Sequence, residues 1–295
     1  MEQLNMEHNV LLLCVNYQND AETLAFVKSI FAIDQRRRVS VVIADNTVGS
    51  EADRARFQGD VMTLGERVCV VSENRNLGYF GGLNAALKKS QTQFRGTPFS
   101  CVILSNTDIE FGDRHFFDDL CSLVSRHSGE ACMQNESLVG LIAPTIESSR
   151  TKANQNPLYR KKPSRGKFTY LSAVYSVYPF GVVHRLLSKV KNVLKAKLVR
   201  KPAAEKDEFV YAAHGSFMVL LNRYFARGGQ LRYLEFLFCE EIFVAEQCAA
   251  MGLKTLFSPA LRVAHREHAT TGLFPSRAIV RYLQRSHLFC RNSYF

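Results

Sequence analysis

Cys101-Val-Ile-Leu-Ser-Asn-Thr-Asp108 is the stretch of sequence that decides the predicted fold. Its apolar part is short and bounded by polar residues, as in a buried strand, and it ends abruptly in two oxygen-bearing side chains, Asn106 and Asp108. In an open α/β sheet, ligands bind beyond the carboxyl ends of the strands. A carboxylate there, with a second oxygen ligand nearby, can hold a divalent cation that neutralises a diphosphate. The same residues also fit an ordinary turn or helix cap.

Similar apolar runs alternate with helix candidates along the chain. This alternation predicts an α/β fold with one Rossmann-like, mostly parallel sheet and helices on both faces. The predicted strands cover residues 10–15, 39–44, 68–71, 101–104, 138–143, 216–221, 255–257 and 261–264, and the predicted helices cover residues 21–31, 82–90, 113–126 and 240–251.

The composition narrows the class of protein further. The 295 residues suffice for one large domain or two small ones, and a hydrophobic content of 46% can fill a sizeable core. The chain has no run of 18 apolar residues and no signal-peptide pattern, so neither a transmembrane helix nor secretion is expected. Eight cysteines occur without any Cys-x-x-Cys pair. Buried free thiols in a reducing cytoplasm therefore fit better than disulfides or a zinc site.

The positive charge is concentrated in one segment. The formal net charge of +11 favours an anionic partner, and fourteen Lys and Arg residues lie between Glu147 and Glu205, where there is no Asp or Glu. Residues 150–167 have the composition of a loop, and residues 184–200 have the pattern of a basic amphipathic helix. Such helices commonly lie on anionic membranes. A solvated helix packed on its own domain is the alternative, and nucleic acid is a third option for which no known motif is present.

Four of the predicted strands end in polar tips. These tips are Asn16-Tyr17, Asp45-Asn46, residues 73–76 and Asn106-Thr107-Asp108. In a parallel sheet they gather along one edge, where a nucleoside needs a carboxylate for its ribose or base and amides for the base edge. One polar tip is commonplace, but four in succession predict a nucleotide site.

A glycine-rich loop follows the third strand. Gly78, Gly81 and Gly82 allow the backbone to approach a ligand and open the next helix, whose N-terminus favours anions. The loop has neither the spacing of a dinucleotide fingerprint nor the lysine of a P-loop. A sugar nucleotidyltransferase is disfavoured as well, because it needs a glycine-rich, lysine-bearing loop directly after the first strand.

The order of these segments resembles family 2 glycosyltransferases, and most closely the bacterial rhamnosyltransferase-like branch of O-antigen and capsule synthesis. The matching segments are residues 15–17, 43–46, 74–84, 104–108, 239–243 and His265. The resemblance implies a GT-A fold, a nucleotide-sugar donor, Mg²⁺ or Mn²⁺, and inversion at the anomeric carbon. It divides the chain into a nucleotide-sugar-binding half (1–149), a basic amphipathic insertion (150–205), an acceptor-binding and catalytic half (206–272) and a C-terminal helical tail (273–295).

The resemblance also implies roles for single residues. Asp108 would ligate the metal, with Asn106 and His265 as further ligands. Asn106 departs from the family's Asp-x-Asp pattern, so it either weakens the metal site or contacts the sugar. The nucleotide sugar would be bound by Asn16, Tyr17, Asp45, Asn46, Asn76, Gly78, Gly81, Gly82, Asn84, Asn106 and Thr107.

Glu240 and Glu241 resemble the family's acidic pair at a helix N-terminus. Inverting transfer needs a base that takes the proton of the acceptor hydroxyl, and the resemblance implies Glu241 for this role, with Glu240 binding the acceptor or orienting the loop. The alternative is that the two acidic residues only stabilise the helix N-terminus through the helix dipole. His214 and Gly215 would border the acceptor site, and residues 268–272 would form a flap over the donor.

The expected function is transfer of a hexose or deoxyhexose from dTDP-rhamnose or a UDP-hexose to a glycan on a polyprenyl diphosphate. The expected location is the inner face of the bacterial cytoplasmic membrane, with the basic insertion as a peripheral anchor and no nucleic-acid partner. The sequence leaves open whether the chain forms a homodimer. The alternative is a catalytically inactive nucleotide-sugar-binding or scaffold subunit of a polysaccharide assembly complex, which Asn106 favours.

Overall fold

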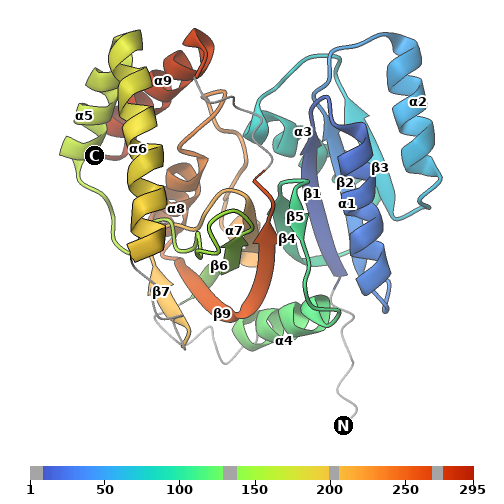
Figure 1. Cartoon of the computed structure of the whole chain (residues 1–295). Coiled ribbons are helices and arrows are strands. Elements are labelled where there is room, and N and C mark those ends of the chain that lie inside the picture. Colours follow the sequence, from blue (N-terminus) through green and yellow to red (C-terminus); the bar gives the residue numbers. More distant parts are fainter. Residues whose placement is uncertain (1–8, 129–137, 199–205, 268–274) are drawn as a thin grey trace.

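The computed structural model describes residues 9–128, 138–198, 206–267 and 275–295, and within these ranges nine strands form one sheet. The strand order is β3-β2-β1-β4-β8-β6-β9-β5, and β7 pairs with β9. Six strands run in one direction and β5, β7 and β8 run in the other, so the mostly parallel sheet is confirmed. The strands are β1 (Asn9–Asn16), β2 (Val39–Asp45), β3 (Val68–Ser72), β4 (Phe99–Ser105), β5 (Ile109–Glu110), β6 (Val139–Ser148), β7 (Glu208–Val210), β8 (Phe217–Leu221) and β9 (Lys254–His265) (Figure 1).

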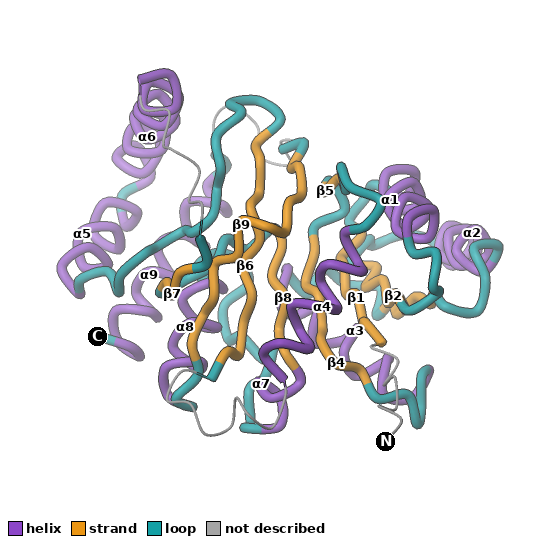
Figure 2. The backbone as a smooth tube through the Cα atoms, turned by 90° about the horizontal axis from the view of Figure 1, so that it is seen from below, coloured by secondary structure: helices purple, strands orange, loops and turns teal. Residues whose placement is uncertain are grey.

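Helices cover both faces of the sheet (Figure 2). The buried side chains of α1, α2 and α4 lie on one face, and those of α3, α7 and α8 lie on the other. The helices are α1 (Asp20–Ile33), α2 (Glu51–Met62), α3 (Tyr79–Gln93), α4 (Phe116–Ser128), α5 (Arg165–Ser176), α6 (Tyr178–Leu198), α7 (Asn222–Ala226), α8 (Glu240–Ala250) and α9 (Arg277–Tyr294).

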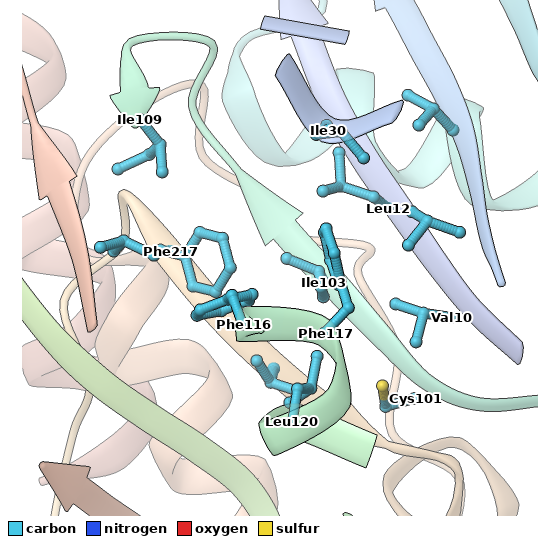
Figure 3. Close-up of a cluster of buried hydrophobic side chains, with 14 of the residues drawn as sticks. Val10, Leu12, Ile30, Cys101, Ile103, Ile109, Phe116, Phe117, Leu120 and Phe217 are labelled. Carbon is cyan, nitrogen blue, oxygen red and sulfur yellow. The ribbon is translucent and has the colours of Figure 1, made fainter. Parts of the chain in front are cut away.

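Burial on both faces explains why the central strands are apolar without alternation. In β1, Val10 and Leu12 point to the α1–α4 face, whereas Leu11 and Leu13 point to the α3–α8 face. Successive side chains of a strand point to opposite faces, so a strand covered on both sides needs apolar residues throughout. Figure 3 shows the first of these cores, where Val10 and Leu12 pack with residues of α1, α4, β4 and β8.

The structure adds β5, β7, α5 and α7, which the sequence did not predict, and α5 begins inside the predicted loop 150–167. It also corrects two further details of the predicted elements. The strands expected at 255–257 and 261–264 are one strand, β9, in which the pairing with β6 shifts from Ser258 to Arg262. The sequence pattern also gave no sign of α2, because only Phe57 and Val61 are buried there and the apolar periodicity is weak. Its cap is conventional: Ser50 Oγ accepts a hydrogen bond from the backbone N–H of Asp53.

Three helices, α5, α6 and α9, pack together beside the sheet, and we call them the helical cap (Figure 1). Tyr175 of α5 packs against Val280 and Leu283 of α9. Gly181 lets α6 approach closely, since a Cβ atom at this position would lie 2.8 Å from Val280. The expected amphipathic helix and C-terminal helix are thus present, with α6 beginning at Tyr178 and residues 199–200 lying outside the described ranges.

Two further expectations concern membranes and thiols. In the described part of the chain, no helix combines the length and the apolar content needed to cross a membrane. All seven cysteines within the described ranges are free, as expected from their spacing.

Candidate active site

The polar strand tips lie along one edge of the sheet. The parallel register pairs Asn16 with Asp45 and Asp45 with Ser72, and it places Ser105 beside Cys14. The carboxyl ends of β6 and β9 meet at the same edge, where Ser148 pairs with His265. Two segments distant in sequence therefore join the four tips: the residues that precede β8 and the end of β9.

Asn16 and Asp45 are buried and bound to each other at one end of this edge. Asn16 Nδ2 donates to Asp45 Oδ1 at 3.0 Å and to Asp20 Oδ1 at 2.8 Å, and its own Oδ1 accepts from Thr23 Oγ1. Asp45 Oδ1 also accepts from the backbone N–H of Thr47. Tyr17 is 42% exposed, so among these tip residues its ring is accessible to a ligand.

The glycine-rich loop is fastened to the tip of β2. Asn46 Nδ2 donates to the carbonyl oxygen of Gly78 at 2.8 Å, and the N–H of Gly78 donates to Asn76 Oδ1. Gly78 has φ +73°, and a Cβ atom there would lie 2.0 Å from the carbonyl oxygen of Phe236. Gly82 allows α3 to pack closely on β1 and β2, because a Cβ atom on Gly82 would lie 3.1 Å from Val15 and 3.2 Å from Asn46. Asn46, Gly78 and Gly82 therefore have structural roles, because they hold the loop and α3 against the strands.

Asp108 and His265 form the candidate metal site. The pairing of Ile109 with His265 brings the two side chains together, and His265 Nε2 lies 3.2 Å from Asp108 Oδ1. Adjacent ligands of an octahedral Mg²⁺ bound at about 2.1 Å lie about 3 Å apart, so the spacing fits one shared cation. No group of three or more His, Cys, Asp or Glu side chains able to hold a metal occurs among the described residues, and Asn106, the third predicted ligand, would add a neutral oxygen.

The tautomer of His265 is set by Gln155. Gln155 Nε2 donates to Glu267 Oε1, which directs Gln155 Oε1 toward His265 Nδ1 at 2.8 Å. Nδ1 therefore donates, and Nε2 presents its lone pair toward Asp108 when the ring is neutral. A lone pair facing a carboxylate needs a proton or a cation between them, which is the arrangement of a metal-binding histidine with its supporting hydrogen bond.

Asn106 is held through its backbone beside this pair. Its N–H donates to the carbonyl oxygen of Ser216 at 2.9 Å, and its own carbonyl oxygen accepts from Ser105 Oγ. These bonds join the end of β4 to the residues that precede β8. The side chain of Asn106 offers only a neutral oxygen, so charge at the candidate metal site comes from Asp108.

Glu240 and Glu241 begin α8 after two residues in the left-handed region. Phe238 and Cys239 have φ +73° and +64°, which costs of order 1–3 kcal/mol for each such residue and occurs mainly at functional sites. Glu240 is buried, and burial followed by repulsion from Glu241 raises its pKa from 4.5 to about 8. Burial also raises the pKa of Glu241, which accepts a hydrogen bond from the N–H of Gly215 at 3.3 Å.

The hydroxyl of Tyr79 is bonded to the turn that holds Glu241. It donates to the carbonyl oxygen of Gly215 at 3.1 Å. Burial raises the pKa of Tyr79 well above 10, and the negative charges of Glu240, Glu241 and Asp108 raise it further. The turn 214–216 connects α8 to the end of β4, because Gly215 donates to Glu241 and Ser216 accepts from the N–H of Asn106.

His214 is a neutral donor in this turn. Burial, followed by the charge of His265, lowers the pKa of His214 to about 4. Its Nδ1 accepts from the backbone N–H of Ser216 at 3.2 Å, so Nε2 carries the proton at neutral pH. The backbone N–H of His214 donates to Asn156 Oδ1 at 2.6 Å, which ties the turn 214–216 to the loop after β6.

Sequence patterns did not single out Tyr79, Gln155 or Asn156. Tyr79 lies inside the glycine-rich loop, where its aromatic ring gave no chemical signal. Gln155 and Asn156 lie in the predicted loop 150–167, and they reach the site because residues 153–155 bond back to β6. Only the tertiary fold brings them to His265 and His214. The expected flap at residues 268–272 lies outside the described ranges.

A hollow of about 330 Å³ adjoins the end of β9, since Ala264, the neighbour of His265, is part of its lining. It is lined by α4, β6 and β9, and includes Phe116, Glu147 and Arg262. None of the predicted site residues lines it. The polar edge, rather than this hollow, therefore carries the candidate chemistry.

Comparison with known proteins identifies the fold. No protein-family model matches the chain, and no curated protein matches it by sequence. The crystal structure of GalNAc-T7 with UDP, GalNAc and Mn²⁺ superposes with a TM-score of 0.55 at 12% identity, over 88% of this chain and 44% of that one. The fold is therefore that of GT-A glycosyltransferases, as expected.

A second solved structure belongs to the same class of enzymes. It is the mannosyltransferase PcManGT from Pyrobaculum calidifontis in complex with GDP-Man and Mn²⁺, with a TM-score of 0.48 and 14% identity, over 89% of this chain and 58% of that one. The chain spans about half the length of these two solved proteins.

Proposed function

We propose that this chain is an inverting, metal-assisted glycosyltransferase that uses a nucleotide-diphosphate sugar. The observation that carries the proposal is the turn 214–216, which joins the two parts of the site. The N–H of Gly215 donates to Glu241, and the carbonyl oxygen of Ser216 accepts from the N–H of Asn106. The ring centroid of His214 lies 6.1 Å from that of His265. A metal ligand for the donor and a base for the acceptor must face the same anomeric carbon, and these residues supply both on a GT-A fold.

Asp108 and His265 would hold Mg²⁺ or Mn²⁺, and the bound ion would neutralise the charge that develops on the leaving diphosphate. Gln155 keeps the ring of His265 oriented through Nδ1. The nucleoside would lie toward the Asn16–Asp45 end of the edge, where the ring of Tyr17 is accessible.

Glu241 would take the proton of the attacking acceptor hydroxyl. Its raised pKa brings its proton affinity closer to neutral pH, which suits a general base. Glu240, with a pKa of about 8, keeps its proton at neutral pH, so the two neighbours do not both carry charge. The N–H of Gly215 fixes the carboxylate of Glu241, and the Nε2–H of His214 can donate to a substrate oxygen.

For substrates, we propose transfer of a hexose or deoxyhexose from dTDP-rhamnose or a UDP-hexose to a polyprenyl-diphosphate-linked glycan. This rests on the resemblance of the segments around Asp45, the glycine-rich loop, Asp108 and Glu241 to the bacterial rhamnosyltransferase-like branch. The pathway would be the synthesis of surface polysaccharide.

The test is hydrolysis of a panel of UDP-, GDP- and dTDP-sugars with and without Mn²⁺. We expect metal-dependent hydrolysis of at least one donor by the wild-type protein, and its loss in Asp108→Asn. Glu241→Gln is expected to abolish transfer to a glycan acceptor, whereas Glu246→Gln, on the same helix, is the matched control and is expected to retain transfer.

A wild-type protein that hydrolyses no donor, and transfers none, would contradict the proposal. Thermal shift with the same panel then separates two outcomes, because a ligand that binds only the folded state raises the melting temperature. Stabilisation without turnover would indicate the inactive nucleotide-sugar-binding subunit that the neutral Asn106 favours.

A further inference from the structure

The outer side of the helical cap carries a row of exposed apolar side chains. Phe180, Val183, Leu187 and Val190 follow each other at intervals of three or four residues on α6, which puts them on one helix face. Tyr170 and Val177 extend the row along α5 and its junction with α6. These six residues, which we call the apolar row, are more than half of the eleven large hydrophobic side chains exposed in the described structure.

The opposite face of α6 holds the helix on the cap. Gly181 contacts Val280 of α9, and Val182 packs against the cluster of Tyr175 and Leu283. The apolar row is therefore not needed to attach α6 to the protein. In Figure 2, α6 lies at the outer end of the molecule, beyond α5 and away from the central sheet.

The helical cap also carries the whole positive excess of the chain. The helices α5, α6 and α9 contain eleven Lys and Arg residues and no Asp or Glu. The remainder of the chain contains 27 Lys and Arg against 27 Asp and Glu, so it is electrically neutral. Charge and exposed apolar surface thus coincide in one part of the fold.

We propose that the helical cap docks on an anionic lipid surface. The apolar row would insert among the lipid headgroups, and exposed basic side chains such as that of Lys191 would contact them. A second copy of the chain would bring two clusters of eleven positive charges together. Nucleic acid would match the charge but would leave aliphatic Val183, Leu187 and Val190 in water. An anionic bilayer satisfies both features.

Docking would also bring the proposed enzyme to a lipid-linked acceptor, and this one step rests on the proposed function. Phe238, two residues before Glu240, packs against Tyr175 and Val280 of the cap, and Ile242, next to Glu241, packs with Phe168 and Cys290. The cap therefore supports the acidic pair on both sides. A lipid-linked acceptor would approach the proposed base from the membrane on which the cap is docked.

The test is co-sedimentation with vesicles of phosphatidylcholine alone and of phosphatidylcholine mixed with phosphatidylglycerol. We expect the wild-type chain to bind the mixed vesicles and to bind them less as salt is raised. Leu187→Asp and Phe180→Asp should each weaken the partition about tenfold or more, because each removes an inserted apolar side chain and adds a repelled charge.

Met62→Asp is the matched control. Met62 on α2 is 70% exposed and Leu187 is 64% exposed, so both changes add one negative charge at an exposed helical position. Met62→Asp should bind vesicles as the wild type does, and far-ultraviolet circular dichroism should show all three variants folded.

Wild-type protein that ignores the mixed vesicles, or variants of the apolar row that bind as well as the wild type, would overturn the proposal. The proposal would also be overturned if the wild type formed a dimer, or a complex with duplex DNA, that Leu187→Asp disrupts, while the wild type bound no vesicles. Donor hydrolysis measured without lipid separates the two proposals. If the chain binds vesicles but hydrolyses no donor, the docking proposal stands and only the proposed enzymatic function is refuted.

Discussion

His265 Nε2 lies 3.2 Å from Asp108 Oδ1, although 157 positions separate the two residues in the chain. The short antiparallel contact between β5 and β9 produces this meeting, since Ile109 pairs directly with His265. The backbone adds to it, because the N–H of Arg266 donates to the carbonyl oxygen of Asp108. The candidate metal site is thus a product of strand pairing.

Gln155→Leu should weaken metal binding without unfolding the protein. The change removes the acceptor that orients Nδ1 of His265, and loss of such a supporting hydrogen bond typically costs about 10–100-fold in metal affinity. The measurement is a Mn²⁺ titration followed by thermal shift. Lys152→Met, an exposed change in the same loop, should leave the Mn²⁺ affinity unchanged, and equal affinities in wild type and Gln155→Leu would refute the role of Gln155.

Glu240 should make the folded state less stable as the pH rises. The native protein keeps this carboxyl protonated up to about pH 8, whereas the unfolded chain releases the proton near its ordinary pKa of 4.5. The native state therefore binds more protons between these values, so its contribution is complete below pH 4.5 and is lost as the pH rises through about 8. Each unit of raised pKa corresponds to about 1.4 kcal/mol.

Glu240→Gln should flatten this dependence, because glutamine is neutral throughout. Urea unfolding at pH 5 and pH 8.5 checks the difference between the variant and the wild type. Glu246→Gln serves as the control on the same helix and should follow the wild type. If the free energy of unfolding changed equally with pH in the wild type and in Glu240→Gln, burial would not keep the Glu240 carboxyl protonated.

Tyr79→Phe should lower kcat more than it changes KM. The hydroxyl holds the carbonyl oxygen of Gly215, whose N–H in turn fixes Glu241, so its removal loosens the proposed base and spares the donor site. A net hydrogen bond is worth about 0.5–1.5 kcal/mol, or roughly 2–12-fold in rate. The pH profile of kcat should shift as well, and Tyr17→Phe, which alters an exposed ring at the nucleoside end, should not shift it.

Gly78→Ala should be far more damaging than Gly96→Ala. Both glycines have positive φ, +73° and +84°, which disfavours any residue with a side chain. Gly78 also has ψ −177°, and this combination is essentially restricted to glycine. A methyl group on Gly96 would meet open space, whereas one on Gly78 would lie 2.0 Å from the carbonyl oxygen of Phe236. Chemical denaturation measures the free energy of unfolding of each variant. Equal losses of stability in the two variants would mean that the loop 74–84 shifts to accommodate the methyl group at little cost.

The strand tips were predictable because a polar residue after an apolar run is a local pattern. Asn16 and Asp45 end β1 and β2, and Asp108 lies three residues after β4, so parallel pairing places these tips on one edge. The acidic pair and the GT-A fold came from the resemblance to family 2 glycosyltransferases, which the order of these local segments carries.

The partners of those residues were not predictable, because they depend on contacts between distant segments. Gln155 reaches His265 only after the loop following β6 folds back along that strand, and Tyr79 reaches Gly215 across 136 positions. The continuity of β9 was hidden for a related reason. Pro259 and the following residues bulge out of the pairing with β6, so the pattern looked like two strands.

The charge distribution has a consequence for motion as well as for binding. Because α5, α6 and α9 hold the formal charge excess and the charges of the remainder sum to zero, the net positive charge of the molecule lies off-centre, at the helical cap. A field from any negatively charged body turns such a molecule before contact, over a range set by the Debye length of about 10 Å at 0.1 M salt. In dilute electrolyte the cap would therefore lead the approach, and encounters would start in one orientation rather than at random.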